Sequence, residues 1–391
     1  MNRRLFIASV AGLALGNLLA GCSGKNQSTL RVLLLNGSIP PQILDEFRSF
    51  AKQLSSNTTL DFAPEPQLQT LFSLLQAWKK QGNQSTSSSG FPSWVPVLGK
   101  SASEIPDLVT LGSYWLEKAV QQKLVQPLDL NQLKNWNQLP PKWKELVTYD
   151  SPKPSDSKRS WGAPYRWGTT VIAYRQDIFK EQGLALPTDW SDLWRSDLRG
   201  RISLLDQPRE VIGLILKKLG KSYNLSNLNS VPALEAELKS LQPQVKYYSS
   251  DSYLQPLLLG DTWVALGWSE DVVSVMKRSP TIAAVVPKSG TALWADLWVR
   301  PASGATTISP LVSEWINFCW RPNIASQLSV LSGATSPIIL DDRENQPPSL
   351  RANPLLLPDE QILQLSEFLQ PLSPATVQQY QALWKTLRQF G

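Results

Sequence analysis

A chain of 391 residues is longer than one hydrophobic core usually serves, so its length predicts two domains. It contains no histidine, which excludes serine and cysteine triads in their usual form and removes the commonest general base and metal ligand. The formal net charge of +6 comes from scattered basic residues rather than from a stripe of lysine and arginine, so nucleic-acid binding is not expected.

The N-terminus has the pattern of an export signal. Arg3 and Arg4 precede an apolar run that is too short to span a membrane. The arginine pair is similar to a twin-arginine signal, and the general secretory route stays open. The run ends in Leu19-Ala20-Gly21-Cys22, which resembles the bacterial lipobox. We therefore expect residues 1–21 to be removed, Cys22 to carry lipid, and the polar residues 22–29 to form a tether.

The first part of the chain predicts alternating strands and helices, and a strand, a helix and a second strand in succession imply a parallel sheet. Residues 81–105 are rich in Ser, Gly and Pro and lack periodicity, which indicates a surface insertion. Tyr114 follows a short apolar strand, at the strand end where ligands collect in open α/β sheets. The predicted strands are 30–35, 58–62 and 106–112, and the predicted helices are 42–53, 68–78 and 114–123.

The second part of the chain repeats this pattern. Cys319 lies in a predicted helix, where we expect a buried residue without a catalytic role, because the chain has no histidine to activate it. Residues 341–357 are predicted to be an irregular loop. The predicted strands are 161–174, 202–206, 245–248 and 263–268, and the predicted helices are 190–194, 211–219, 253–259, 313–319, 322–331, 359–369 and 376–390.

Residues 285–296 contain the pattern with the clearest chemical meaning. An apolar run ends at Pro287 and Gly290 and then resumes as a short strand that carries Trp294 and Asp296. Side chains two positions apart on a strand project from the same face. An indole beside a carboxylate suits a ligand that is both cationic and apolar. The alternative is that Trp294 is an ordinary core residue.

Several segments together resemble the bacterial extracellular solute-binding proteins of ABC importers, in particular the spermidine/putrescine-binding group. The resemblance covers about residues 30–337. It is carried by Ile39-Pro40-Pro41, Pro106-Asp107-Leu108-Val109 with Tyr114-Trp115-Leu116-Glu117-Lys118, Pro164-Tyr165-Arg166-Trp167-Gly168-Thr169, Leu205-Asp206-Gln207-Pro208-Arg209-Glu210-Val211-Ile212-Gly213, and Val286-Pro287-Lys288-Ser289-Gly290 through Trp294-Ala295-Asp296.

This resemblance implies an α/β, two-lobed periplasmic binding protein fold of type II. Each lobe is expected to hold a mixed, mainly parallel sheet flanked by helices, with the ligand cleft between the lobes. The implied first lobe comprises residues 30–168 and 297–334, and the implied second lobe comprises residues 169–296 and 335–391. The resemblance implies no catalysis, no cofactor and no metal.

The family's ligand residues carry over only where this chain matches. By resemblance, Tyr114 is an aromatic wall, Glu210 faces one ammonium group, Trp268 lies on the cleft floor, and Trp294 with Asp296 forms the central pair. A polyamine needs such a set, because aromatic faces cover its methylenes and attract its cations while carboxylates neutralise its ammonium groups.

Three departures from the family pattern favour a shorter or less charged ligand than spermidine, or weaker binding. The stretch 36–39 lacks the usual aromatics, Gln207 stands where spermidine binders tend to carry an aspartate, and Ala334 replaces a tyrosine.

Some acidic residues have two interpretations at this level. Glu210 can also favour the N-terminus of a helix through its position in the first turn. Asp206 is either a helix N-cap or a ligand group. Glu270 and Asp271 are either caps or a second anionic contact.

The expected function is capture of a spermidine- or putrescine-like cation and its delivery to a membrane permease driven by an ATPase. The protein is expected to be a monomer, exported to the periplasm or cell surface and held to the membrane by its lipid anchor. The alternatives are a binding protein of the same fold for a sugar, thiamine or iron, or a secreted hydrolase that uses two carboxylates.

Overall fold

The computed structural model describes residues 28–82, 105–150, 158–304 and 309–389. The predicted signal peptide and Cys22 lie outside these residues, as does most of the predicted surface insertion. Residues 28 and 29, predicted to end the tether, instead begin the first strand, because they pair with Thr58 and Thr59 of its neighbour. Across these four ranges, no helix has both the length and the apolar character needed to cross a membrane.

Eleven of the described strands join into one mixed sheet, with the order β2-β1-β3-β12-β7-β10-β8-β9; β11 pairs with β7, and β4 and β13 pair with β12. The remaining pair, β5 and β6, forms a separate hairpin. The strands are β1 Ser28–Leu35, β2 Thr58–Glu65, β3 Leu108–Gly112, β4 Val125–Gln126, β5 Thr148–Tyr149, β6 Arg159–Ser160, β7 Ala163–Arg175, β8 Ile202–Leu204, β9 Val245–Tyr248, β10 Val264–Trp268, β11 Ile282–Val285, β12 Ala292–Pro301 and β13 Glu367–Phe368.

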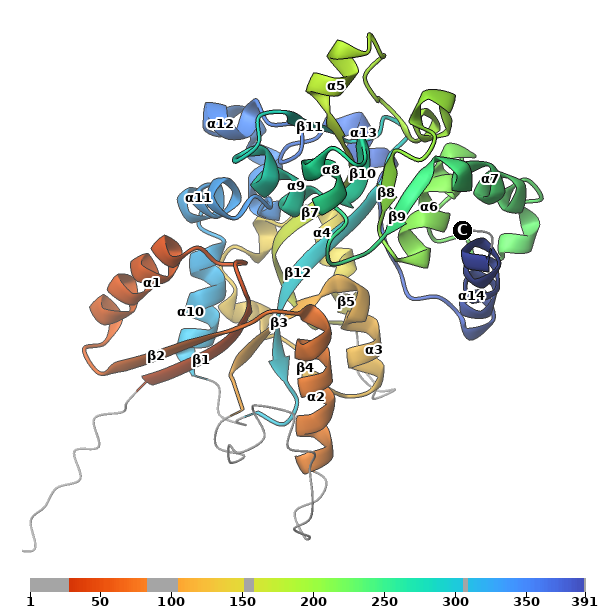
Figure 1. Cartoon of the computed structure of the whole chain (residues 1–391). Helices are drawn as coiled ribbons and strands as arrows, with labels where there is room; N and C mark the ends of the chain where they lie inside the picture. The colour runs from red at the N-terminus through yellow and green to blue at the C-terminus, as the bar shows by residue number, and fades with distance from the viewer. Residues whose placement is uncertain (1–27, 83–104, 151–157, 305–308, 390–391) are drawn as a thin grey trace, which may run out of the picture.

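This strand order places the strands in two lobes, and β7 and β12, in the middle of the order, run between the lobes (Figure 1). The first lobe contains β1, β2 and β3, which are parallel, with β12 antiparallel to β3. The second contains β8, β9, β10 and β11. Residues 163–169 of β7 pair with β12, whereas residues 170–175 pair with β10 and β11. The predicted α/β fold with two lobes is confirmed, and the predicted residue boundaries between the lobes stay a prediction.

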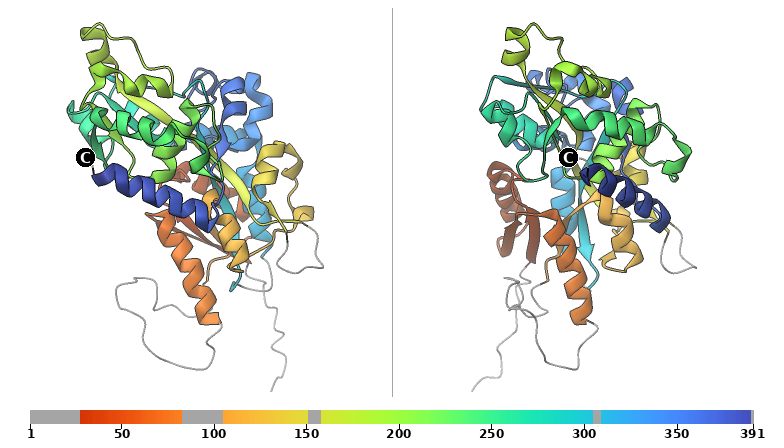
Figure 2. Two further views of the ribbon diagram at one scale, coloured as in Figure 1. Left: turned by 90° about the vertical axis from the view of Figure 1, so that its right-hand side faces the viewer. Right: turned by 45° about the vertical axis from the view of Figure 1, so that its right-hand side comes forward.

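Helices flank the sheet in both lobes (Figure 2). Proline begins many of them, as its fixed φ and missing N–H suit the first helical turn. The α-helices are α1 Pro41–Leu54, α2 Leu68–Gly82, α3 Leu116–Gln121, α4 Pro141–Leu146, α5 Gln176–Glu181, α6 Pro208–Lys218, α7 Leu234–Leu241, α8 Gln255–Leu259, α9 Ser269–Met276, α10 Pro310–Cys319, α11 Pro322–Ser332, α12 Pro348–Arg351, α13 Glu360–Leu365 and α14 Pro374–Gln389.

Aromatic side chains dominate the core of the first lobe. Phe47 of α1 lies 4.8 Å from the ring of Trp315 on α10, and Trp315 lies 5.6 Å from Trp298 on β12. Trp298 in turn stacks on Tyr165 of β7 at 4.1 Å. Cys319 ends α10 fully buried, as predicted, and burial raises the pKa of its thiol. This cluster joins β7 and β12 rigidly to the first lobe.

Three predicted elements differ in the structure. The helix predicted at 114–123 is split into a 3-10 turn, Ser113–Trp115, and α3. The loop predicted at 341–357 overlaps the end of a 3-10 segment, Pro337–Asn345, and contains α12, each begun by a proline. The helix predicted at 359–369 ends at Leu365, because the next residues pair with β12 as β13.

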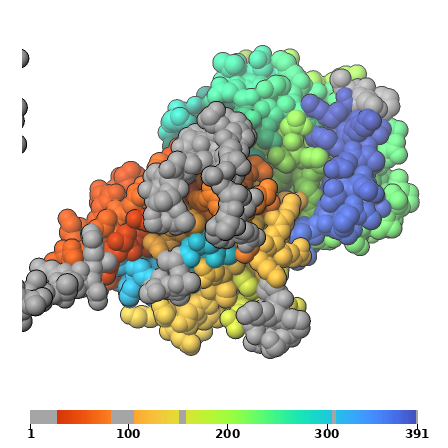
Figure 3. All heavy atoms as spheres, turned by 90° about the horizontal axis from the view of Figure 1, so that it is seen from below, coloured from red at the N-terminus to blue at the C-terminus, as the bar shows by residue number. Residues whose placement is uncertain are grey.

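The C-terminal helix α14 belongs with the second lobe. It packs against α6 and α7, and Figure 3 shows it in blue against the green residues of that lobe. Arg209 at the start of α6 fastens this segment, since its guanidinium donates to the Gln370 carbonyl at 3.1 Å and lies 5.2 Å from the ring centroid of Tyr380. The start of α6 is therefore held between the sheet and the end of the chain.

Candidate functional site

The strand register brings four of the five predicted site residues together. β7 lies between β12 and β10, with Trp294 and Asp296 opposite Gly168 and Arg166 on one side. On its other side, Trp268 lies opposite Thr170. Paired residues share a face, and so do residues two apart on a strand. One face of the sheet at the junction of the lobes therefore carries these side chains, and Glu210 reaches them from α6.

Close packing of the strands leaves no room for a side chain at Gly168. A Cβ atom there would lie 2.4 Å from the indole ring of Trp294 and 2.5 Å from Oγ of Ser269. Oγ of Ser269 accepts a hydrogen bond from the Thr169 backbone at 3.1 Å, which fixes the start of α9 beside β7. The predicted same-face arrangement of Trp294 and Asp296 thus rests on a glycine beneath the indole.

Arg166 lies beside this central pair. Its Nε donates to Oδ2 of Asp296 at 2.8 Å, and its Nη2 lies 2.7 Å from the same oxygen. Its Nη1 donates to Oε1 of Glu270. The guanidinium carbon lies 5.8 Å from the ring centroid of Trp294. One cation of the protein is therefore held by two carboxylates and an indole.

Burial sets the protonation of this cluster. Arg166 is fully buried and Asp296 is only 2% exposed. Burial raises the pKa of Asp296 to about 6, with Arg166 opposing the rise and Glu270 adding to it. The pKa of Arg166 is raised despite desolvation, because Glu270 and Asp296 favour the charged form. The cluster therefore places the carboxyl groups of two elements, β12 and α9, around one guanidinium.

Glu210 has a different environment. It lies in the first turn of α6 and is 7% exposed. Its Oε2 accepts a hydrogen bond from the Thr170 hydroxyl at 3.0 Å, and its Oε1 accepts one from Nε1 of Trp268 at 3.4 Å. Burial raises its pKa, and these two donors, together with the more distant charge of Arg209, oppose the rise. Neutral donors hold this carboxylate, so its charge is not balanced by a direct ion pair in the described residues.

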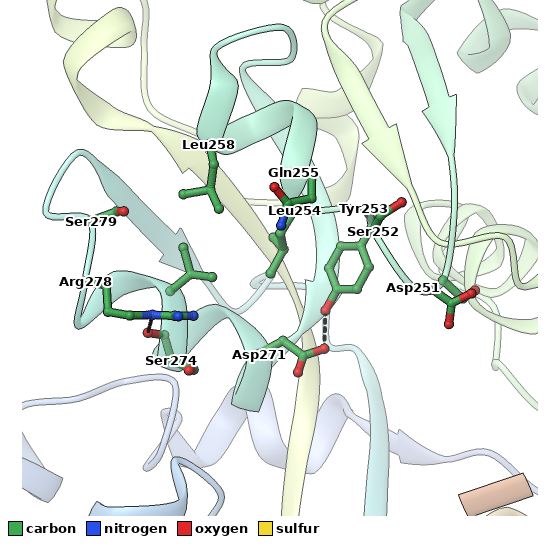
Figure 4. A pocket seen from close by; sticks show the side chains of 12 residues that line it. Asp251, Ser252, Tyr253, Leu254, Gln255, Leu258, Asp271, Ser274, Arg278 and Ser279 are labelled. Carbon is green, nitrogen blue, oxygen red and sulfur yellow. Dashed lines mark hydrogen bonds between the residues drawn. The ribbon is translucent and has the colours of Figure 1, made fainter. Parts of the chain in front are cut away.

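Trp268 is positioned by Tyr253. The Tyr253 ring meets the indole edge-on at 5.9 Å, and its hydroxyl accepts from the Trp268 backbone at 3.3 Å. The same hydroxyl donates to Oδ2 of Asp271 at 2.6 Å, the bond that Figure 4 shows at one side of a cavity of about 420 Å³. Residues 250–279 of the second lobe line this cavity, so it does not lie between the lobes.

Tyr114, the fifth predicted residue, lies further out. Its side chain is 40% exposed and packs edge-on against Trp115 at 6.1 Å. The turn that carries it is fixed to β12, because Oγ of Ser113 accepts from the Ala295 backbone at 3.2 Å. The pKa of Tyr380 on α14 is raised by burial, with Arg209 opposing the rise and Tyr114 adding to it.

The contacts of Asp206, Glu270 and Asp271 show the environment of each of these acidic residues, for which the sequence left two interpretations. The N-cap of α6 is Gln207, without a side-chain capping bond, so the N-cap interpretation of Asp206 is wrong; its carboxylate lies 4.0 Å from Arg388. Glu270 contacts Arg166, and Asp271 contacts Tyr253. Glu270 alone of that pair belongs to the sheet-face cluster.

The residues that sequence reasoning missed are Arg166 and Thr170. A signal for both was present, since positions 166, 168 and 170 alternate along one predicted strand and share a face. The partner of each side chain depends on strand register, which the sequence does not show.

Comparison with known proteins gives concordant results. A sequence model of the family described as "Bacterial extracellular solute-binding protein" matches residues 103–364. The "Spermidine/putrescine-binding periplasmic protein" of Escherichia coli (strain K12) is 28% identical over 270 residues, which cover 69% of this chain and 74% of that protein. The "Putrescine-binding periplasmic protein PotF" of the same organism is 27% identical over 338 residues, covering 82% and 81%.

The fold is also that of solved structures. The spermidine/putrescine ABC transporter substrate-binding protein PotD from Streptococcus pneumoniae superposes with a TM-score of 0.75 at 20% sequence identity. The match covers 93% of this chain and 99% of that one.

Proposed function

Because this chain belongs to the family of bacterial extracellular solute-binding proteins, we propose that it is the substrate-binding component of an ABC importer and captures a polyamine-class cation between its lobes. It then delivers this cation to membrane permease subunits driven by an ATPase. The relatives whose names specify spermidine or putrescine support this class of ligand.

The observation that carries the proposal is the buried carboxylate of Glu210 beside the indole of Trp268. Amine groups of polyamines have a pKa near that of lysine, about 10, and are charged at neutral pH. An ammonium group placed at Glu210 would form an ion pair with this desolvated carboxylate and so stabilise its charged form. Trp268 and Trp294 would cover the methylenes, and each cation–aromatic contact is worth about 0.5–2 kcal/mol. Tyr114 forms the outer wall in this proposal.

Asp296 is proposed to act together with Glu270. Both hold Arg166, and Glu270 keeps 26% of its side chain exposed. Their shared negative charge gives the central part of the cleft its attraction for a second ammonium group.

A second candidate ligand is a neutral molecule with hydroxyl acceptors, such as a sugar. Nε1 of Trp294 is buried and has no acceptor among the described residues, and an acceptor on the ligand would satisfy it. The buried carboxylate of Glu210 gives the cationic ligand the stronger support.

The test is thermal unfolding of the mature protein with putrescine, spermidine, spermine and a panel of sugars. Ligand at 100 times its dissociation constant adds about 2.7 kcal/mol to the free energy of unfolding. A shift with an amine is expected. A shift with a sugar and with no amine would overturn the amine assignment and support the second candidate.

Export and anchoring complete the proposal. Residues 1–21 are proposed to be a signal peptide and Cys22 the lipid-bearing residue, which would place a monomer at the membrane surface in the periplasm or outside the cell. Cys22→Ser should move the protein from the membrane fraction to the soluble fraction. Retention of the variant in the membrane would contradict lipid anchoring at this cysteine.

A further inference from the structure

The place beside the central indole–carboxylate pair is already filled by a cation of the protein. The Arg166 guanidinium contacts Asp296 at 2.7–2.8 Å and lies 5.8 Å from the centroid of Trp294. A carboxylate on one side and an aromatic ring on the other is the environment that an ammonium group of a ligand needs.

This internal cation is permanent. Arginine stays protonated in proteins, and its planar fork binds carboxylates in fixed geometry. Arg166 is fully buried, and its two carboxylate partners come from different elements, β12 and α9. A ligand would have to break both contacts to take its place.

The charges on this face can be counted. Asp296 and Glu270 contact the Arg166 guanidinium, and Glu210 is held by Thr170 on the same face, so three carboxylates and one guanidinium leave two negative charges for a ligand. Arg209 is not counted, because its guanidinium is bound by the Tyr223 and Gln370 carbonyls. Asp271 is not counted, because its carboxylate accepts from Tyr253 and lines the cavity inside the second lobe (Figure 4). Two ammonium groups balance this site, whereas a third would be buried without a partner, which is costly.

We propose, in an inference that rests on the proposed function, that Arg166 takes the place of one ligand ammonium group. The cleft therefore selects short diamines over triamines. One ammonium group of the diamine binds Glu210, between Thr170 and Trp268. The other binds the outer side of the Arg166 cluster, at the solvent-accessible carboxylate of Glu270. Arg166 is thus a specificity-determining residue that holds the place of a third amine.

The experiment measures dissociation constants of putrescine and spermidine by calorimetry for the wild-type protein and Arg166→Met. The wild-type protein should bind putrescine at least tenfold more tightly than spermidine. Arg166→Met leaves Asp296 without its cation, so a third ammonium group can bind there and the ratio should shift toward spermidine by tenfold or more. Arg166→Lys keeps a cation and should keep the preference for putrescine.

Two further variants complete the design. Arg175→Met removes the arginine at the C-terminal end of β7, which is paired with Asp177, and should leave the ratio unchanged. Arg166→Gln has an amide that can still donate to a carboxylate, and it replaces Arg166→Met if that variant does not fold. Circular dichroism verifies the fold of each variant.

The outcomes separate this inference from the proposed function. If the wild-type protein binds neither amine, the proposed function fails and the inference fails with it. If it binds spermidine as tightly as putrescine, or if neutral variants at position 166 leave the ratio unchanged, Arg166 is only a structural ion pair and the proposed function stands.

Discussion

The sheet face at the lobe junction carries buried charge at both ends, and the partners of that charge differ between the two ends. At one end, Arg166 lies between Asp296 and Glu270, so each charge has a partner within the protein. At the other, the hydrogen bonds that Glu210 accepts within the described part of the chain come from the Thr170 hydroxyl and the Trp268 indole N–H. A paired charge stabilises the fold, whereas a carboxylate kept among neutral donors can bind a cation that arrives from outside.

The largest effect on stability is expected from breaking the paired end. Arg166→Met should lower the free energy of unfolding by about 3–5 kcal/mol, because it leaves the buried carboxylate of Asp296 and the partly exposed carboxylate of Glu270 without their cation. Chemical denaturation of the ligand-free protein measures this loss. Arg48→Met on α1 is the matched control, since its exposed pair with Asp45 should contribute about 1 kcal/mol or less. Equal losses in the two variants would contradict the distinction.

The next largest effect is expected on binding at the unpaired end. Glu210→Gln keeps the size of the side chain but removes its charge, so amine affinity should fall about 30- to 200-fold, or about 2–3 kcal/mol. Titration calorimetry with putrescine measures the change. Glu235→Gln, on the exposed face of α7, should bind like the wild-type protein. Unchanged affinity in Glu210→Gln would remove this carboxylate from the site.

A pH series should show opposite signs for stability and binding. Burial raises the pKa of Glu210, so its charged form destabilises the folded ligand-free protein above that pKa. Glu210→Gln should therefore be the more stable protein at pH 8, and its advantage should vanish as the pH falls through the raised pKa toward about 4. Amine affinity of the wild-type protein should fall over the same interval, and also as Asp296, with a pKa of about 6, gains a proton.

These two measurements check each other. Denaturation at several pH values gives the stability difference between wild type and Glu210→Gln, and calorimetry gives the affinity. A stability difference that does not vary with pH would show that Glu210 has an ordinary pKa.

The smallest effect is expected from a residue that positions the unpaired end. Tyr253→Phe removes the hydroxyl between the Trp268 backbone and Asp271 but keeps the ring contact with the indole. Amine affinity should fall about three- to tenfold, corresponding to about 0.5–1.5 kcal/mol for one hydrogen bond. Tyr247→Phe, an exposed site on β9, is the control. A loss as large as that of Glu210→Gln would mean that Tyr253 contacts the ligand itself.

The sequence allowed most strands and helices to be predicted, because their periodicity and their proline and glycine boundaries are local. The pairing of Trp294 with Asp296 on one face followed from the period of two along a strand. The role of Arg166 did not, because it depends on the register between β7 and β12 and on where α9 begins. The short strand β13 escaped prediction for the same reason, since two residues become a strand only through a distant partner.

The lack of a side chain at position 168 has a consequence for the substitutions that this sheet face can accept. Because the indole of Trp294 occupies the space where a Cβ would be, position 168 tolerates only glycine while that indole remains. Its neighbours at 166 and 170 carry the side chains that hold the two kinds of carboxylate. Substitutions at positions 166 and 170 can therefore change the charge of this sheet face while glycine is kept at position 168.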